Sequence, residues 1–228
     1  MTALAQLGWS PFFEEQVDVH LRGDRRIARI VEQQRGLYAV DGEFEGLAEA
    51  SGRLRHEADA AADLPVVGDW VLVAANDGAD RARIEARLER RSSISRKAAG
   101  RGAAQQVIAA NVDTLFVVTA FAGDLNPRRV ERYLTAVWAG GAVPVVVVNK
   151  SDLAADALTT AASLRDRLPF VDVIAVSALS DEGAAPLRPY VRPASTVALV
   201  GSSGVGKSTI VNRLAGSERQ KIGRGRRG

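Results

Sequence analysis

The sequence predicts a parallel α/β domain preceded by a small all-β barrel, and three observations lead to this fold class. Residues 201–208 match the phosphate-loop pattern G-x-x-x-x-G-K-[ST] without a mismatch. Residues 144–148 form a short apolar, β-branched run that is typical of a buried parallel strand. Short β-type runs separated by turn residues occupy 25–91. The α/β part therefore follows the all-β part along the chain.

Composition places the chain among globular proteins with one or two domains. It has 228 residues, of which 46% are hydrophobic, and a formal net charge of +3, so it has enough apolar residues to bury a core. It contains no cysteine, which excludes disulfides and thiolate metal sites within these residues. No stretch resembles a signal peptide or a transmembrane helix. We therefore expect a cytoplasmic protein without a membrane partner.

The amino-terminal part is predicted to be a lead-in followed by a barrel. Residues 1–24 form the lead-in, and 25–91 contain β-type runs at 27–33, 36–40, 66–75 and 83–88. Short strands at this spacing favour a small barrel. Residues 92–104 are rich in serine, glycine and arginine and are predicted to form a basic linker to a second domain over 105–228.

Basic residues gather between Arg81 and Arg101 and again in the last ten residues of the chain. Such clusters favour a polyanionic partner such as RNA. The candidate RNA contacts are Arg90, Arg91, Arg96, Lys97 and Arg101. The alternative is a solvated basic face followed by a basic tail, neither of which contacts a partner.

Strands and helices alternate in the second domain. A strand at 113–119 is followed by Asn126-Pro127, a cap residue and a proline that typically open a helix. The helix presents an apolar face made of Val130, Tyr133, Leu134, Val137 and Trp138. A second helix over 154–168 leads to a strand at 171–176. This alternation predicts a parallel sheet, which binds ligands beyond the carboxyl ends of its strands.

The phosphate loop lies between a predicted strand at 196–200 and a predicted helix over 207–215. Its glycines permit a path on which backbone N–H groups surround a dense anion. Lys207 is expected to reach the β- and γ-phosphates, and the Ser208 hydroxyl is expected to bind Mg²⁺. The predicted nucleotide-binding residues of this segment are Gly201, Ser202, Ser203, Gly204, Val205, Gly206, Lys207, Ser208 and Thr209. The alternative is a chance glycine-rich turn.

A second motif follows the strand at 144–148 and indicates guanine recognition. Asn149, Lys150, Ser151 and Asp152 form the pattern N-K-x-D. The Asp152 carboxylate can accept two hydrogen bonds from the guanine ring N–H and exocyclic amine, whereas adenine would leave it unpaired. Ser177 and Ala178 follow the next strand and match the S-A-x loop that steadies guanine in GTPases. The alternatives are an ordinary turn at the first site and any strand-to-loop junction at the second.

The guanine motif precedes the phosphate loop by about fifty residues, which reverses the order found in ordinary GTPases. The chain also contains Leu7-Gly8-Trp9, Val67-Gly68-Asp69-Trp70-Val71, Ala110-Asn111-Val112-Asp113 and an Arg-Arg-x-Glu-Arg-Tyr-Leu run at 128–134. Together these features resemble the family of ribosome small subunit-dependent GTPases, which are circularly permuted GTPases. The resemblance covers nearly the whole chain.

The resemblance implies an OB-fold for 25–91, an architecture that often binds oligonucleotides. It implies hydrolysis of GTP to GDP and phosphate with Mg²⁺, and a role in the late maturation of the 30S ribosomal subunit with binding of 16S rRNA. We expect a monomer. The family also has a carboxyl-terminal zinc module, whose Cys and His ligands do not occur in this chain.

The sequence departs from the family after the phosphate loop. No threonine follows Thr209, and no Asp-x-x-Gly turn occurs anywhere, although GTPases use both to hold Mg²⁺ and position water. We therefore expect a fragment of a longer protein and assign no catalytic residue. Two other functions stay open. One is a guanine-nucleotide and RNA-binding switch without hydrolysis, and the other is a P-loop ATPase or kinase in which residues 149–152 match the guanine motif by accident.

Overall fold

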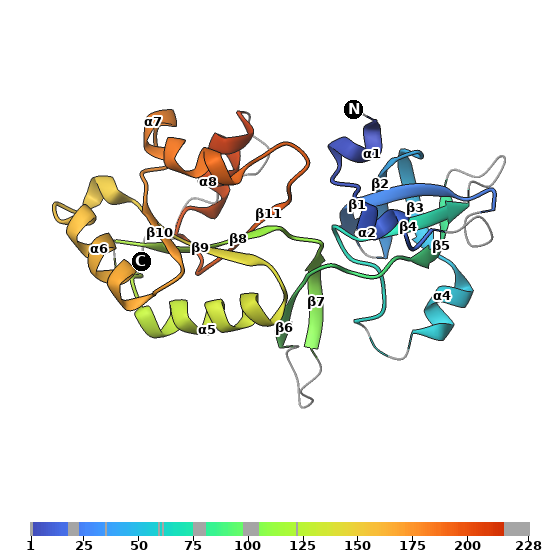
Figure 1. Ribbon diagram of the computed structural model, residues 1–228, viewed down its shortest axis with the longest axis horizontal. Helices are drawn as coiled ribbons and strands as arrows, with labels where there is room; N and C mark the ends of the chain where they lie inside the picture. Colours follow the sequence, from blue (N-terminus) through green and yellow to red (C-terminus); the bar gives the residue numbers. More distant parts are fainter. Residues whose placement is uncertain are drawn as a thin grey trace. The chain divides into compact units, whose positions relative to one another are not determined.

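A computed structural model describes residues 2–17, 23–34, 36–58, 60, 62–74, 81–97, 105–121 and 123–216. Its internal contacts divide the chain into two units (Figure 1). The first unit comprises Met1–Val112 with Pro193–Thr196, and the second comprises Asp113–Arg192 with Val197–Gly228. Each unit has its own hydrophobic core.

The first unit is built on a closed five-stranded barrel, which confirms the predicted OB-like fold. Its strands are β1 (Arg26–Gln34), β2 (Leu37–Gly42), β3 (Gly46–Ala50), β4 (Trp70–Ala74) and β5 (Ala82–Arg87), in the spatial order β1-β2-β3-β5-β4. Strand β3 was missing from the sequence prediction, because its residues, Gly-Leu-Ala-Glu-Ala, lack β-branched side chains. A short helix, α4 (Gly52–Glu57), follows β3.

Side chains that alternate along the strands fill the barrel. Ala28 and Ile30 of β1 are buried against Val71 and Val73 of β4 and Ile84 of β5, as the two-residue period of a strand requires.

The predicted lead-in forms α1 (Ala3–Gln6) and α2 (Pro11–Glu14). Aromatic side chains from this segment pack on the barrel at a second cluster that includes Trp9, Phe13 and Trp70.

A hairpin occupies the segment that was predicted to be a linker. Strand β6 (Ser93–Lys97) pairs antiparallel with β7 (Gln105–Ala110), and both belong to the first unit. Ile94 and Val107 are buried, so the hairpin anchors two apolar side chains among its serines and arginines. Composition alone pointed to a linker because these apolar residues are few. Residues 98–104, the rest of the predicted linker, lie outside the described residues.

The second unit contains a four-stranded parallel sheet, as predicted. The strands are β8 (Thr114–Ala120), β9 (Val143–Asn149), β10 (Asp172–Ala175) and β11 (Val197–Val200), in the order β10-β9-β8-β11. The helical segments are α5 (Pro127–Ala139), η1 (Ser151–Leu153), α6 (Ala157–Arg167), α7 (Asp181–Ala184), η2 (Ala185–Tyr190) and α8 (Lys207–Ala215). Helices α5 and α8 cover opposite faces of the sheet (Figure 1).

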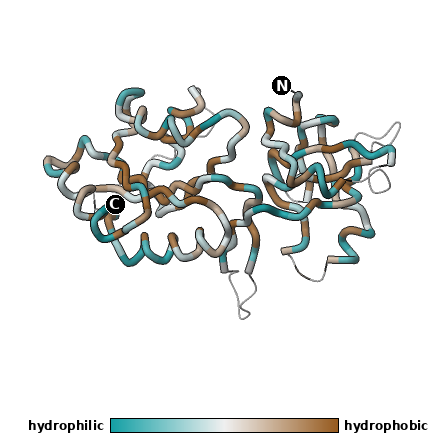
Figure 2. Tube along the Cα trace, in the orientation of Figure 1, coloured by the Kyte–Doolittle hydropathy of each residue, from teal (hydrophilic) through white to brown (hydrophobic). Residues whose placement is uncertain are grey.

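The hydrophobic pattern of these elements follows their burial. Hydrophobic residues run along the strands of the sheet, whereas hydrophilic residues lie on the outer sides of the helices (Figure 2). In α5, Val130, Leu134 and Val137 are buried, and the Asn126 side chain caps the helix by accepting from the Arg129 backbone N–H at 3.2 Å. Trp138, which was predicted to belong to the inner face, is instead 54% exposed, because it lies at the edge of the apolar stripe.

The strand order contains a point at which the chain changes direction across the sheet. From β8 the chain proceeds through β9 to β10, and it then returns to place β11 on the other side of β8. In open α/β sheets, ligands bind beyond the carboxyl ends of the strands at such a switch point. The phosphate loop follows β11 at this point.

Candidate functional site

The phosphate loop connects β11 to α8 on a path that only glycine can follow at two positions. Gly201 has a φ of +150°, and a Cβ there would lie 2.1 Å from the Val118 carbonyl oxygen. Gly206 has a φ of +100°, and a Cβ there would lie 2.2 Å from the Asn149 amide nitrogen. L-residues with side chains rarely adopt such φ values. The glycines therefore allow the loop to approach β8 and the guanine motif closely.

Lys207 and Ser208 lie at the start of α8, directly after the loop. The Lys207 ammonium donates to the carbonyl oxygens of Gly201 and Ser202 at 2.9 and 2.7 Å, so its charge is held over the loop. Thr209 lies in the same first turn. The partial positive charge of the helix amino terminus and the ammonium both favour an anion at this place.

Asn149 joins the three predicted motifs into one site. Its side-chain amide is buried, with the residue 3% exposed. The amide nitrogen donates to the Val205 carbonyl of the phosphate loop at 2.9 Å, and the amide oxygen accepts from the Ala178 backbone N–H at 3.1 Å. Segments that lie 56 and 29 residues away in the sequence are therefore held by a single side chain.

The remaining residues of the guanine motif form a short turn after β9. Lys150 adopts a left-handed conformation with a φ of +63° and is the cap residue that precedes η1. The Ser151 backbone N–H donates to the Val176 carbonyl at 3.0 Å. The Ser177 hydroxyl donates to the Asp152 carboxylate at 2.6 Å, which fixes the orientation of the carboxylate that was predicted to read guanine. The structure thus brings all of the predicted base-binding residues to neighbouring loops of one sheet edge.

Two leucines beside these motifs were not predicted from the sequence. Leu153 follows Asp152 and is 65% exposed, and Leu179 follows Ala178 and is 70% exposed. Exposed apolar side chains of this size gain from contact with a flat ring. The available signals were the position of Leu153 directly after the guanine motif and that of Leu179 as the last residue of the S-A-x loop.

The segment after β8 contributes a charged pair, Asp124 and Arg129, whose contacts were not predicted, although Arg129 belongs to the 128–134 run that resembles the family. The Arg129 guanidinium donates to the Asp124 carboxylate and to the Ser202 hydroxyl of the phosphate loop. The Thr119 hydroxyl at the end of β8 donates to the Asp124 carbonyl at 2.9 Å. Arg129, in the first turn of α5, therefore braces the phosphate loop across the switch point of the sheet.

The predicted RNA contacts in the first unit have different environments. Arg90 is corrected to a structural residue, because its side chain is 11% exposed and pairs with the fully buried Asp69 carboxylate at 2.8 Å. Arg91 is exposed, and Arg96 is exposed and donates to the Gln106 side chain at 3.1 Å. Of the other candidates, Lys97 ends β6, whereas Arg101 and the basic residues of 219–227 lie outside the described residues.

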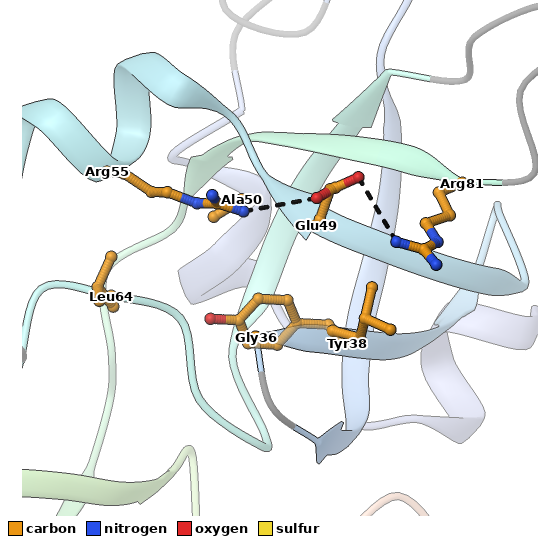
Figure 3. A pocket seen from close by; sticks show the side chains of 8 residues that line it. Gly36, Tyr38, Glu49, Ala50, Arg55, Leu64 and Arg81 are labelled. Atoms are coloured by element: carbon orange, nitrogen blue, oxygen red, sulfur yellow. Dashed lines mark ion pairs between the residues drawn. The ribbon is translucent and has the colours of Figure 1, made fainter.

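The barrel carries a hollow of about 400 Å³ (Figure 3). Arg55 and Arg81 approach the Glu49 carboxylate from two sides, at 3.6 and 4.0 Å. Burial raises the pKa of the Tyr38 hydroxyl above its ordinary value, while the charge of Arg55 opposes this and that of Asp69 adds to it. The lining residues are Gly36, Leu37, Tyr38, Glu49, Ala50, Arg55, Leu64 and Arg81.

Metal binding was predicted only at Ser208. The described residues contain no group of three or more His, Asp or Glu side chains that could hold a metal ion. The position of Ser208 beside the phosphate loop suits Mg²⁺ that is bound mainly by phosphate oxygens and water, which is the usual arrangement for this ion. Among the described helices, none is long and apolar enough to cross a membrane.

Comparison with known proteins gives matches over most of the chain. The family model described as RsgA GTPase matches residues 87–227. A small ribosomal subunit biogenesis GTPase RsgA from Opitutus terrae is 42% identical over 229 residues, covering 96% of this chain and 62% of that protein. The protein of the same name from Xylella fastidiosa is 45% identical over 207 residues, a match that covers 87% of this chain and 57% of that protein. The chain thus spans about three fifths of these relatives.

Solved structures show the same fold. YjeQ from Thermotoga maritima superimposes with a TM-score of 0.66 at 22% identity, covering 83% of this chain and 65% of that one. YloQ, described as a circularly permuted GTPase, gives a TM-score of 0.62 at 21% identity, covering 86% and 66%. The order in which the chain meets its guanine motif and its phosphate loop is therefore a known arrangement of this fold.

Proposed function

Because the chain belongs to the RsgA GTPase family, we propose that it binds GTP and takes part in hydrolysing it to GDP and phosphate during late maturation of the 30S ribosomal subunit. The observation that supports this most directly is the Asn149 side chain, which bonds to the phosphate loop and to the 177–179 loop at once. A site held together in this way suits one ligand that carries both a base and phosphates.

Each motif has a separate task in binding. Asp152, oriented by the Ser177 hydroxyl, accepts from the ring N–H and exocyclic amine of guanine. Leu153 and Leu179 cover the base. Lys207 and the N–H groups of 201–206 neutralise the phosphates.

Ser208 and the phosphates would hold Mg²⁺, which would supply charge neutralisation during phosphoryl transfer. We assign the described residues to binding and orientation of the nucleotide, and none of them to the activation of water.

We propose that the first unit binds RNA. The barrel presents Arg55 and Arg81 around its hollow, and Arg96 lies on the β6–β7 hairpin. Phosphates attract such arginines, and grooves of small barrels often take up unpaired nucleotides. The relatives are named for small ribosomal subunit biogenesis, so 16S rRNA within the 30S particle is the partner that we propose. A cytoplasmic monomer suits this role.

Equilibrium binding of fluorescent GDP, GTP and ATP analogues with Mg²⁺ tests the nucleotide assignment. We expect guanine-selective binding that is weakened by Asp152→Ala and by Lys207→Ala. Asp152→Ala acts on the base, so it lowers selectivity, whereas Lys207→Ala acts on the phosphates and lowers the affinity for all three nucleotides. Equal binding of ATP and GTP would remove the guanine assignment.

Hydrolysis and RNA binding are tested separately. Turnover of GTP in the presence of 30S particles supports the GTPase, whereas nucleotide and RNA binding without turnover supports the alternative of a non-hydrolytic switch. For RNA, we expect Arg55→Ala and Arg81→Ala to weaken binding of single-stranded RNA and to reduce its salt dependence. Arg128→Ala, on α5 of the second unit, is the matched control.

A further inference from the structure

We propose that Arg213 is a positioning residue for guanine recognition, which holds the base-binding loop 177–179 against the helix that carries the phosphate loop. This inference rests on the proposed nucleotide site. Arg213 lies in the last turn of α8, outside every motif found in the sequence. The hydrogen bonds of its side chain go to Ala178, Leu179 and Asp181, so its effect on the ligand passes through the loop.

The Arg213 guanidinium uses all three of its nitrogens on the loop and its continuation. One terminal nitrogen donates to the Leu179 carbonyl at 2.7 Å, and the other donates to the Asp181 carboxylate at 3.2 Å. The inner nitrogen donates to the Ala178 carbonyl at 3.4 Å. A planar guanidinium suits such a set of acceptors, because its donors are fixed relative to one another.

These contacts close a circuit through the site. Arg213 holds the carbonyl of Ala178, while the N–H of the same residue donates to Asn149. Asn149 in turn donates to Val205 of the phosphate loop, which leads directly into α8 and back to Arg213. Both the backbone N–H and the backbone carbonyl of Ala178 are therefore held by hydrogen bonds, and the phosphate loop belongs to the same set of contacts.

The position of this loop matters for the choice of base. Guanine carries a carbonyl oxygen where adenine carries an amino group, so the position of the peptide groups beside the base distinguishes the two bases. Leu179 is 70% exposed, and its side chain is therefore poorly anchored by packing. Without the guanidinium, the loop would keep the hydrogen bonds of Ser177 to Asp152 and of the Ala178 N–H to Asn149. The carbonyls of Ala178 and Leu179 would lose their donor, so the peptide groups would no longer be held in place beside guanine.

The experiment measures the dissociation constants of GDP and ADP for the chain and its variants. The three hydrogen bonds of the guanidinium are lost in Arg213→Ala, so we expect GDP to bind about tenfold more weakly. The ADP constant should hardly change, because adenine gains nothing from the loop. Arg213→Lys should resemble Arg213→Ala, since an ammonium cannot reach the same acceptors together.

Arg165→Ala is the matched control. Arg165 also donates from a helix to a backbone carbonyl of this unit, that of Val173 at 2.8 Å, but it lies outside the circuit. We expect it to leave the ratio of GDP to ADP affinity unchanged. Thermal unfolding of each variant shows whether it is folded, and Asp181→Ala, which removes one acceptor of the guanidinium, provides a milder second test with a smaller loss of selectivity.

The possible results separate the two proposals. If the wild-type chain prefers GDP and Arg213→Ala and Arg213→Lys keep that preference in full, the role of Arg213 is refuted and the nucleotide site stands. Equal losses of GDP and ADP affinity would also refute it, because they would show a general structural role. If the folded wild-type chain shows no preference for guanine, the proposed function fails, and this inference fails with it.

Discussion

Gly206→Ala should destabilise the second unit through a specific collision. The new Cβ would lie 2.2 Å from the Asn149 amide nitrogen, and Gly206 has a φ of +100°. The amide must therefore move, which breaks its bonds to the Val205 carbonyl and the Ala178 N–H. Each bond lost in a buried site costs about 1–3 kcal/mol, and the left-handed backbone costs about 1–2 kcal/mol. The sum is about 3–8 kcal/mol.

Gly204→Ala is the control for the backbone contribution. Gly204 has a φ of +81°, but nothing lies within 4 Å of a Cβ placed there, so only about 1–2 kcal/mol is expected. Urea unfolding, monitored through the hydrogen exchange of peptides from β8 and β9, measures the free energy of unfolding of the second unit alone. In an Asn149→Ala background, Gly206→Ala should cost no more than Gly204→Ala. Equal costs of the two alanines in the wild-type background would refute the reasoning.

Three further predictions concern other parts of the chain. Asp69→Ala should destabilise the first unit by about 3–5 kcal/mol, because Arg90 loses the carboxylate that it contacts at 2.8 Å; urea unfolding with an unchanged midpoint would contradict this. Burial and the hydrogen bond to Asp172 raise the pKa of Tyr190 to about 12, so its ionisation favours the unfolded state. The free energy of unfolding should therefore fall between pH 10 and 12 more steeply in the wild-type chain than in Tyr190→Phe. Parallel plots of this free energy against pH for the two proteins would contradict the prediction. Arg129→Ala should release GDP about two- to tenfold faster in stopped-flow displacement, and an unchanged rate would show that the phosphate loop needs no such brace.

The sequence predicted the parts of the site whose signals are local. Gly201 and Lys207 belong to a contiguous motif between an apolar strand and an amphipathic helix, so their type, spacing and position identify them together. The parallel sheet was predicted for the same reason, since each of its strands is a short and mostly apolar run.

The contacts that lie between motifs could not be predicted. Arg129 and Ser202 are 73 residues apart, and Arg213 and Ala178 are 35 apart. The local sequence therefore identifies neither contact, although Arg129 lies in the 128–134 run that resembles the family. Arg90 shows the opposite error. It lies in a basic stretch, and only the fold reveals the buried carboxylate of Asp69 beside it. Composition reports how much charge a segment has, but not which side chains the fold buries.

The strand order also determines how the second unit bears a mechanical load. Strand β11 is joined to β8 through four residue pairs, Val197–Val200 with Thr114–Val117, whereas β8 and β9 share seven. A pull on the chain beyond α8 would therefore shear the β8–β11 seam first. The phosphate loop follows β11 on one side of this strand pair, and the guanine motif follows β9 on the other side. A nucleotide bound to both would link the two sides, so the force needed to separate β8 from β11 would rise with the concentration of ligand.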